Sequence, residues 1–416
     1  MNEVNIKKID WLSVFILSIL IALGLGNVYS SSQTYLLDSI FSFNPFTKQL
    51  FFAIISVFIF FFIQILSINF FIKYSSILYI LSILSLIGLF VFGNEVNGAL
   101  AWYQINGFSI QPSEFAKPIT ALALAKYLSD INSNIKTIKT QFYSFLIILI
   151  PITLIMLQPD PGTIIIFLSF ILVFYKIGLP SIYMNLFVGF IILFFATILL
   201  TPKNVILFLI VSMLIFIFLN KKNKKVIKKT LIYGLIFSLF VFSVDFIFNN
   251  IFEERHRNRF NIVMGIKQDN QGTGYNTNQS RIAFASGGLT GEGFLKGSQT
   301  RGNFVPEQHT DYIFSTVGEE WGFLGASFII LLYTFLMLRI AKRAELQRSL
   351  FSKIYSYSAV TIIFSHFFIN IGMVIGLVPT IGIPLPFLSY GGSSLMAFVL
   401  LFSIYVKLDS ERTSKW

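Results

Sequence analysis

Three side chains that can carry or exchange a proton lie just ahead of an apolar run. Glu307, His309 and Asp311 alternate along the chain, and the run follows from Tyr312. A carboxylate where a loop enters an apolar segment can act as a general base toward a hydroxyl group. Asp311 is the candidate for that role, and Glu307 and His309 would shape the base or contact the substrate. Alternatively, Thr310 or Asp311 only caps a helix, and the other two make ordinary loop hydrogen bonds.

A second chemical candidate is a lysine in an apolar segment. Lys117 follows Glu114 by three residues after Pro112, so in a helix the two side chains share a face. An ionisable group within a membrane span is costly and is therefore a functional candidate by default. A purely structural Glu114–Lys117 ion pair is the alternative interpretation.

These residues belong to a chain that lipid must solvate. Of its 416 residues, 55% are hydrophobic and 12% are charged, which is too little polar surface for a soluble globule. The apolar residues fall in blocks near the roughly 20 residues that a spanning helix needs. We expect about twelve spans, at residues 11–29, 50–68, 72–93, 112–128, 142–158, 162–178, 181–200, 204–219, 230–248, 312–338, 355–379 and 386–407.

The distribution of charge predicts an orientation for these spans. With a cytoplasmic N-terminus, the basic segments 126–139, 221–229, 339–348 and the tail from Lys407 all fall inside, as the positive-inside rule requires. Both termini are then cytoplasmic, and the net charge of +12 needs no nucleic acid to explain it. The same count places residues 94–111, 158–160, 249–311 and 379–392 outside. Without cysteine, thiolate chemistry is excluded.

The polar stretch 249–311 is the longest interruption of the apolar pattern. Glycine-rich runs alternate there with charged and hydrogen-bonding residues, which favours an ordered loop over a disordered tail. A solvated connector is the alternative. We expect a single membrane domain, residues 1–416, that carries this loop and presents its chemistry at the outer face.

Six motifs stand out along nearly the whole chain. They are Gln111 to Lys117, Gln158 to Thr163, Gln279-Ser280, Ser286 to Leu289, Pro306 to Phe314 with Gly318 to Glu320, and Pro384 to Ser394. In this order they resemble the motifs of the SEDS family of RodA and FtsW. Gln308 and the run Gly382 to Pro386 resemble RodA of the elongation machinery more than the division protein FtsW.

The resemblance implies an all-α, polytopic helical bundle in the bacterial cytoplasmic membrane. The family typically has ten helices, so residues 181–219 would be an inserted hairpin, which leaves the orientation unchanged. Pro161 stands where the family more often has an apolar side chain, which would stiffen the turn after Asp160.

The implied activity is a peptidoglycan glycosyltransferase for cell elongation and rod shape. It would polymerise lipid II, the undecaprenyl-diphosphate-linked disaccharide-pentapeptide, through an inverting β-1,4 linkage onto the nascent glycan strand. Asp311 matches the catalytic aspartate, and Lys117 would contact the diphosphate or lower the pKa of a carboxylate. The implied partner is a class B penicillin-binding protein.

The supporting site residues would line one outer cavity. Trp102 has an interfacial anchor as its alternative role, and Arg259 has solvated surface charge. No dedicated metal-ligand cluster is evident, although a divalent cation, Mg²⁺ or Mn²⁺, would bridge the diphosphate and Asp311. Besides Glu114, Lys117, Glu307 and His309, the set comprises Gln111, Trp102, Asp160, Arg259, Gln279, Ser280, Gly288, Ser389 and Gly391.

Three other functions compete with an elongation polymerase. A flippase for lipid-linked precursors would place its charges in a central cavity reached from both sides, whereas the polar motifs here gather on one expected face. A scaffold without activity leaves the recurring carboxylates and basic residues unexplained. An FtsW-type division polymerase would share the chemistry and differ in its cellular role.

Overall fold

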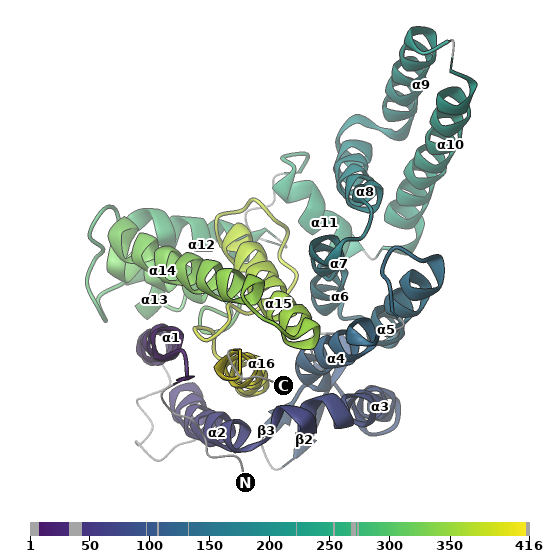
Figure 1. Ribbon diagram of the computed structural model, residues 1–416. Coiled ribbons are helices and arrows are strands. Elements are labelled where there is room, and N and C mark those ends of the chain that lie inside the picture. The colour runs from purple at the N-terminus through teal and green to yellow at the C-terminus, as the bar shows by residue number, and fades with distance from the viewer. Residues whose placement is uncertain are drawn as a thin grey trace. The chain divides into compact units, whose positions relative to one another are not determined.

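The protein is described by a computed structural model that covers residues 8–32, 44–96, 98–105, 108–131, 133–221, 223–252, 254–267, 272 and 274–412. The chain forms two compact units, one of Met1–Leu179 with Asn276–Trp416, the other of Pro180–Tyr275. Each unit is mainly helical, and Figure 1 labels the elements where there is room. The stretch 249–311, expected as one loop, is divided between the two units.

Ten helices in the described part of the chain are long and apolar enough to cross a membrane. They are α1 (Trp11–Ser31), α2 (Pro45–Ile65), α3 (Ile68–Phe92), α5 (Ile138–Met156), α8 (Ser181–Leu200), α9 (Pro202–Leu219), α10 (Lys224–Phe246) continued by the π-helical η3 (Ile247–Ile251), α14 (Ile313–Glu345), α15 (Leu350–Val374) and α16 (Gly392–Ser410).

The other two expected spans are helical but less regular. Helix α4 (Pro112–Ser129) is less apolar because it carries Glu114, Lys117 and Lys126. The expected span 162–178 is divided into α6 (Pro161–Leu168) and α7 (Ile171–Ile177). The all-α bundle is therefore confirmed with ten clear spans, and the expected total of twelve depends on these two segments.

Local sequence explains where several helices begin. The Asn44 side chain accepts a hydrogen bond from Thr47 N at 2.8 Å, and Pro45 stands at the first helical position of α2. Asp160 caps α6 in the same way, accepting from Thr163 N at 3.1 Å, and Pro161 follows it. Proline suits the first turn because that turn needs no backbone donor. Pro161 therefore begins α6.

Two expectations about the connections need correction. Residues 94–111, expected as a loop on the outer side, contain an antiparallel sheet in the order β1 (Asn94–Val96), β2 (Ala99–Ile105) and β3 (Phe108–Ile110). The last span was expected from residue 386, but α16 begins at Gly392. Prolines at 384 and 386 and the left-handed Phe387, with φ of 67°, keep the preceding segment out of a helix.

The first unit is centred on its two last helices. Of the apolar windows of α16 and α15, 83% and 72% are buried, against 22% for α3. Helix α16 packs against α2, α4 and α15, and α15 also packs against α14 (Figure 1). Polar side chains on α15 and α16 are consequently shielded from the surroundings of the bundle.

The second unit contains the expected hairpin 181–219. Its small core is formed by Leu193 of α8, Val205 of α9 and Val241 of α10. Only 6% of the apolar windows of α8 and α9 are buried within the protein. Such helices are stable only where lipid or another apolar surface covers them. The unit also carries α11 (Glu254–Val263).

Helix α14 is interrupted at Gly322, whose φ of 65° and ψ of −166° are not helical. A glycine-rich segment pairs with the interruption. Glu292 N donates to Glu319 O at 2.9 Å, and Phe323 N donates to Gly288 O at 2.8 Å. Backbone groups left without helical partners in a span must be satisfied in some such way. The backbone carbonyl groups of the Ser286–Leu289 motif therefore accept hydrogen bonds from amide groups at the interruption of α14.

A network of ion pairs lies near the C-terminal end of α14. Arg339 Nη2 lies 2.6 Å from Asp10 Oδ1, ahead of α1, and Arg343 Nε lies 3.1 Å from Asp10 Oδ2. The Arg343 guanidinium also binds the buried Asp409 near the end of α16. Side chains next to three helix ends are thereby held together by charge.

Candidate active site

Asp311 lies half-buried directly before α14. Tyr312 is the N-cap residue of that helix, and its hydroxyl contacts Thr380 at 2.6 Å. The Thr310 hydroxyl donates to Glu307 O and Oε2 at 3.2 and 3.0 Å. Neither Thr310 nor Asp311 is therefore the N-cap residue of α14.

The backbone around Asp311 is held at three consecutive carbonyl groups. Tyr390 N donates to His309 O at 2.8 Å. The Ser389 hydroxyl donates to Thr310 O at 2.7 Å, and Asn370 Nδ2 donates to Asp311 O at 2.8 Å. All three donors come from α15 or from the connection between α15 and α16. Few rotations of this backbone are compatible with all three bonds, so Asp311 stands on a rigid support.

The Asp311 carboxylate faces the connection between α15 and α16. A Cβ atom at Gly382 would lie 3.6 Å from Asp311 Oδ2, and Gly382 has φ of 73°. Glycine is the residue that adopts this conformation without strain and allows a ligand to approach the backbone. Gly382 was not among the predicted site residues, although the run Gly382 to Pro386 was noted for its resemblance to RodA.

Gln111 and Asp160 contact each other at the same end of the unit. Gln111 Nε2 donates to Asp160 Oδ2 at 3.1 Å, and Gln111 N donates to Ser393 Oγ at 3.0 Å. A Cβ atom at Gly162 would lie 2.7 Å from Ile381 O. These contacts bring the N-termini of α4, α6 and α16 together. Ile381 leads directly to Gly382, which lies beside Asp311 ahead of α14, so the N-terminus of α14 belongs to the same region. Helix N-termini carry partial positive charge and favour anionic groups.

Lys117 is buried below this region and makes three contacts. Its ammonium group lies 2.7 Å from Glu114 Oε1, 2.9 Å from His366 Nε2 and 5.4 Å from the ring centre of Phe398. The side chain is 1% exposed. The ion pair expected from the spacing is present, and a direct contact with a diphosphate would require Lys117 to leave this cluster.

His309 and Glu307 lie at the entrance to α14. Burial lowers the pKa of the His309 imidazole below its ordinary value, and the Glu307 carboxylate opposes part of that shift. The imidazole packs against Tyr390, with ring centres 5.4 Å apart. His309 is therefore suited to hydrogen bonding in its neutral form rather than to holding an anion by charge.

Ser389 and Gly391 are held by a side chain that the sequence did not single out. Gln49 Nε2 donates to Ser389 O at 3.2 Å, and Gly391 N donates to Gln49 Oε1 at 3.1 Å. The Ser389 hydroxyl also accepts from Leu385 N at 2.8 Å. These two residues thus build the support of Asp311.

The remaining predicted residues have other surroundings. Gln279 and Ser280 lie on α12 (Tyr275–Ser286), and the Ser280 hydroxyl donates to Val374 O at 3.1 Å. Trp102 is half-buried on β2. Gly288 pairs with the interruption of α14, as described above. Arg259 lies on α11 in the second unit.

Two further residues at the site were assigned no role from the sequence. Asn370 and His366 lie on α15, one helical turn apart, and both contact the connection that supports Asp311. His366 is an ionisable residue inside a span, which is itself a signal of function. Asn370 carries no comparable signal, because a lone amide in a span is often only a packing feature.

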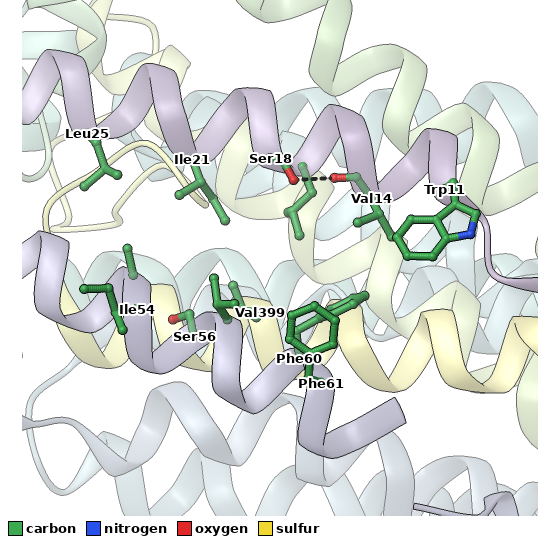
Figure 2. A pocket seen from close by; sticks show the side chains of 13 residues that line it. Trp11, Val14, Ser18, Ile21, Leu25, Ile54, Ser56, Phe60, Phe61 and Val399 are labelled. Atoms are coloured by element: carbon green, nitrogen blue, oxygen red, sulfur yellow. Dashed lines mark hydrogen bonds between the residues drawn. The ribbon is translucent and has the colours of Figure 1, made fainter. Parts of the chain in front are cut away.

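An apolar groove lies elsewhere, between α1 and α2, and has a volume of about 370 Å³. Figure 2 shows Trp11, Ile21 and Leu25 of α1 opposite Ile54 and Phe61 of α2. None of the predicted site residues lines it. Among the residues with a described placement, no group of three or more His, Asp or Glu side chains is arranged to hold a metal ion.

Comparison with known proteins identifies the family. The family model described as cell cycle protein, of FtsW, RodA and SpoVE, matches residues 10–204 and 180–414. The chain is 30% identical to the peptidoglycan glycosyltransferase MrdB of Escherichia coli strain K12 over 340 residues, which cover 80% of this chain and 77% of MrdB. It is 31% identical to the probable peptidoglycan glycosyltransferase FtsW of Wigglesworthia glossinidia brevipalpis over 422 residues, covering 99% and 96%.

A solved structure has the same fold over its length. Its description reads "Structural coordination of polymerization and crosslinking by a peptidoglycan synthase complex". The TM-score is 0.71 at 25% identity, with 98% of this chain and 99% of that chain covered. The protein is therefore a multi-pass membrane protein that belongs to the FtsW, RodA and SpoVE family of the bacterial cell-wall machinery.

Proposed function

We propose that this protein is a peptidoglycan glycosyltransferase that polymerises lipid II, with Asp311 as its general base. The observation that carries the proposal is the rigid support of Asp311 through three consecutive carbonyl groups, at a place where four helix N-termini meet. The names of the relatives MrdB and FtsW support the same activity.

The geometry suggests how the reaction would be divided among the residues. The diphosphate of the donor would lie near the N-termini of α4, α6, α14 and α16, whose partial charges stabilise an anionic leaving group. Asp311 would take the proton from the acceptor 4-hydroxyl as the new bond forms with inversion. The adjacent Gly382 leaves room for the sugar beside the carboxylate.

Elongation rather than division is our narrower proposal. The relatives reported above include both MrdB and FtsW at similar identity, so its support comes from the RodA-like residues. Gln308 is buried and its amide donates to Ser31 O at 2.8 Å and Thr300 O at 3.0 Å. The residue thus joins α1 to the segment that leads to Asp311.

Our proposals for the orientation, the partner and the insertion each have separate support. The basic segments support cytoplasmic termini and an outer active site. A class B penicillin-binding protein is the proposed partner, supported by the description of the solved relative as coordinating polymerization with crosslinking. The two family matches overlap at residues 180–204, which supports an inserted hairpin at 181–219.

A divalent cation, Mg²⁺ or Mn²⁺, would find only part of its ligands in the protein. The Asp311 carboxylate is one oxygen donor at the site, and the diphosphate of the substrate would supply others. Such a cation would neutralise charge on the leaving group.

Incubation of the purified protein with labelled lipid II, alone and with a crosslinking partner, tests the proposal. We expect glycan polymer from the wild type and a loss of about 10²–10⁴-fold with Asp311→Asn. The matched control is Asp130→Asn at the other end of α4, which should polymerise normally. Wild-type yield from folded Asp311→Asn would overturn the assignment, and translocation of lipid II across vesicles without polymer would favour a flippase.

A further inference from the structure

We propose that Asn370 and His366 are positioning residues for Asp311, acting through the connection between α15 and α16. The inference rests on the proposed role of Asp311. Neither residue is proposed to touch the substrate. Asn370 holds the backbone carbonyl group of Asp311 itself, and His366 holds that of Pro384, two residues after the Gly382 that lies beside the carboxylate.

Asn370 joins the two backbone segments that meet at the site. Its side-chain amide donates to Asp311 O at 2.8 Å and to Ile383 O at 2.7 Å. The residue is fully buried, so water does not compete for these bonds. Both hydrogens of one NH₂ group are used, and among the uncharged side chains asparagine and glutamine provide such a pair. Asn370 therefore fixes the spacing between Asp311 and Ile383.

His366 holds the next carbonyl along the connection. Its Nδ1 lies 3.1 Å from Pro384 O, which can only accept, so we assign the proton to Nδ1. The other nitrogen, Nε2, then accepts from the Lys117 ammonium at 2.9 Å. Lys117 thereby favours the tautomer that can donate to Pro384. The buried Glu114–Lys117 pair acquires a role in orienting His366.

The two side chains act as one clamp because of their spacing. Residues 366 and 370 are four apart on α15 and so share a face of the helix. Their acceptors, Ile383 and Pro384, are consecutive and follow Gly382, which lies beside Asp311 Oδ2. A displacement of this connection would change the position of Gly382 relative to the Asp311 carboxylate. Misplacing a reacting group by about 1 Å can cost about 10²-fold in rate.

If Asn370 and His366 only stabilised the fold, their variants would behave differently. A residue that only stabilises the protein lowers the melting temperature and the fraction of active molecules, and the apparent KM does not change. A positioning residue lowers kcat per folded molecule, with KM for lipid II unchanged, because the binding surface remains in place. A conservative side chain that keeps the donor should restore part of kcat.

The experiment compares Asn370→Leu, His366→Leu and His366→Gln in initial-rate assays over a range of lipid II concentrations. The rates are normalised to folded protein. We expect kcat to fall about 10–100-fold for the two leucine variants, with KM within twofold, and to be higher for His366→Gln than for His366→Leu. Ser358→Ala, which removes a bond within α15 to Ile354 O, is the matched control and should retain wild-type rates.

Two results would overturn the inference while leaving the proposed function intact. One is wild-type kcat in folded Asn370→Leu and His366→Leu when Asp311→Asn is inactive. The other is a rise in KM that accounts for the whole loss of kcat/KM. Should Asn370→Leu fail to fold, Asn370→Asp provides the same comparison, because it keeps the size but has no amide hydrogens. Full activity of Asp311→Asn would instead overturn the proposed function itself.

Discussion

The ammonium group of Lys117 lies 2.9 Å from His366 Nε2, although the two residues are 249 positions apart in the chain. It also lies 2.7 Å from Glu114 Oε1. Both charged side chains are almost fully buried, at 1% and 4% exposure. Glu114 Oε2 has no hydrogen-bond partner among the described residues. Loss of the lysine would leave this carboxylate alone in a dry environment.

Lys117→Met should therefore destabilise the protein rather than only inactivate it. Removing one partner of a buried ion pair costs about 3–5 kcal/mol, because the other charge remains buried without compensation. Adding Glu114→Gln removes the stranded charge, so the double variant should melt above Lys117→Met. Thermal unfolding in detergent measures both effects.

Activity separates this structural contribution from the orientation of His366. We expect the folded double variant, Lys117→Met with Glu114→Gln, to polymerise lipid II more slowly than the wild type, because His366 has lost its ammonium partner. An unchanged melting temperature in Lys117→Met would contradict the burial argument. Full activity of the double variant would show that Lys117 is only a counter-ion.

Gly322 should not tolerate a side chain. Its φ is 65°, and an added Cβ would lie 2.3 Å from Gly291 N and 2.7 Å from the Leu289 carbonyl carbon. The backbone conformation alone costs a non-glycine residue about 1–3 kcal/mol, and the contacts add to that cost. We expect Gly322→Ala to lower the melting temperature by several degrees.

Gly26 of α1 provides the matched control for this substitution. A Cβ atom at Gly26 would meet nothing within 4 Å, and its conformation is helical. Alanine is favoured over glycine in a helix by about 1 kcal/mol, so Gly26→Ala should melt at the wild-type temperature or above it. Equal melting temperatures for the two alanine variants would be incompatible with the paired interruption of α14.

How much the sequence could predict depended on the range of the interaction. Apolar blocks of sufficient length predicted most spans, because a bilayer imposes that length on every helix. Lys117 and Glu114 were found from spacing on a single helix, which needs no tertiary information. Asp311 was found because its motif resembles a known family.

Contacts between distant segments could not be predicted in this way. Asn370 contacts Asp311 O across 59 residues, and nothing local to either residue signals it. The interruption at Gly322 was also missed, because a single glycine near the start of a long apolar segment does not by itself indicate a break in the helix. Part of its partner segment, the run Ser286 to Leu289, was predicted as a motif but without its structural role.

The stability of the protein should depend on pH through His309. Burial lowers the pKa of this imidazole below 6.5, against a smaller opposing effect of Glu307. As pH falls below 6.5, the unfolded chain binds the proton more readily than the folded protein, so folding stability is lost. Above that pH both states are neutral and the contribution is fully present.

A comparison with His309→Gln isolates this contribution from other titrating groups. We expect the difference in melting temperature, wild type minus variant, to be constant above about pH 7 and to decrease as pH falls below 6.5. A difference that increases toward acid would show that Glu307 outweighs burial at His309.

The orientation of the chain can be tested at three positions. In the part of the chain that the structure describes, one span-length helix, Lys224–Ile251, leads from Lys225 at its start toward Gly297, and one more, α14, lies between Gly297 and Arg348. The basic segments at 221–229 and 339–348 predict that Lys225 and Arg348 lie in the cytoplasm and that Gly297 lies outside. Reporter fusions should give the same signal at Lys225 and Arg348 and the opposite signal at Gly297. Matching signals at Lys225 and Gly297 would mean that α10 does not cross the bilayer and that the active site was assigned to the wrong side.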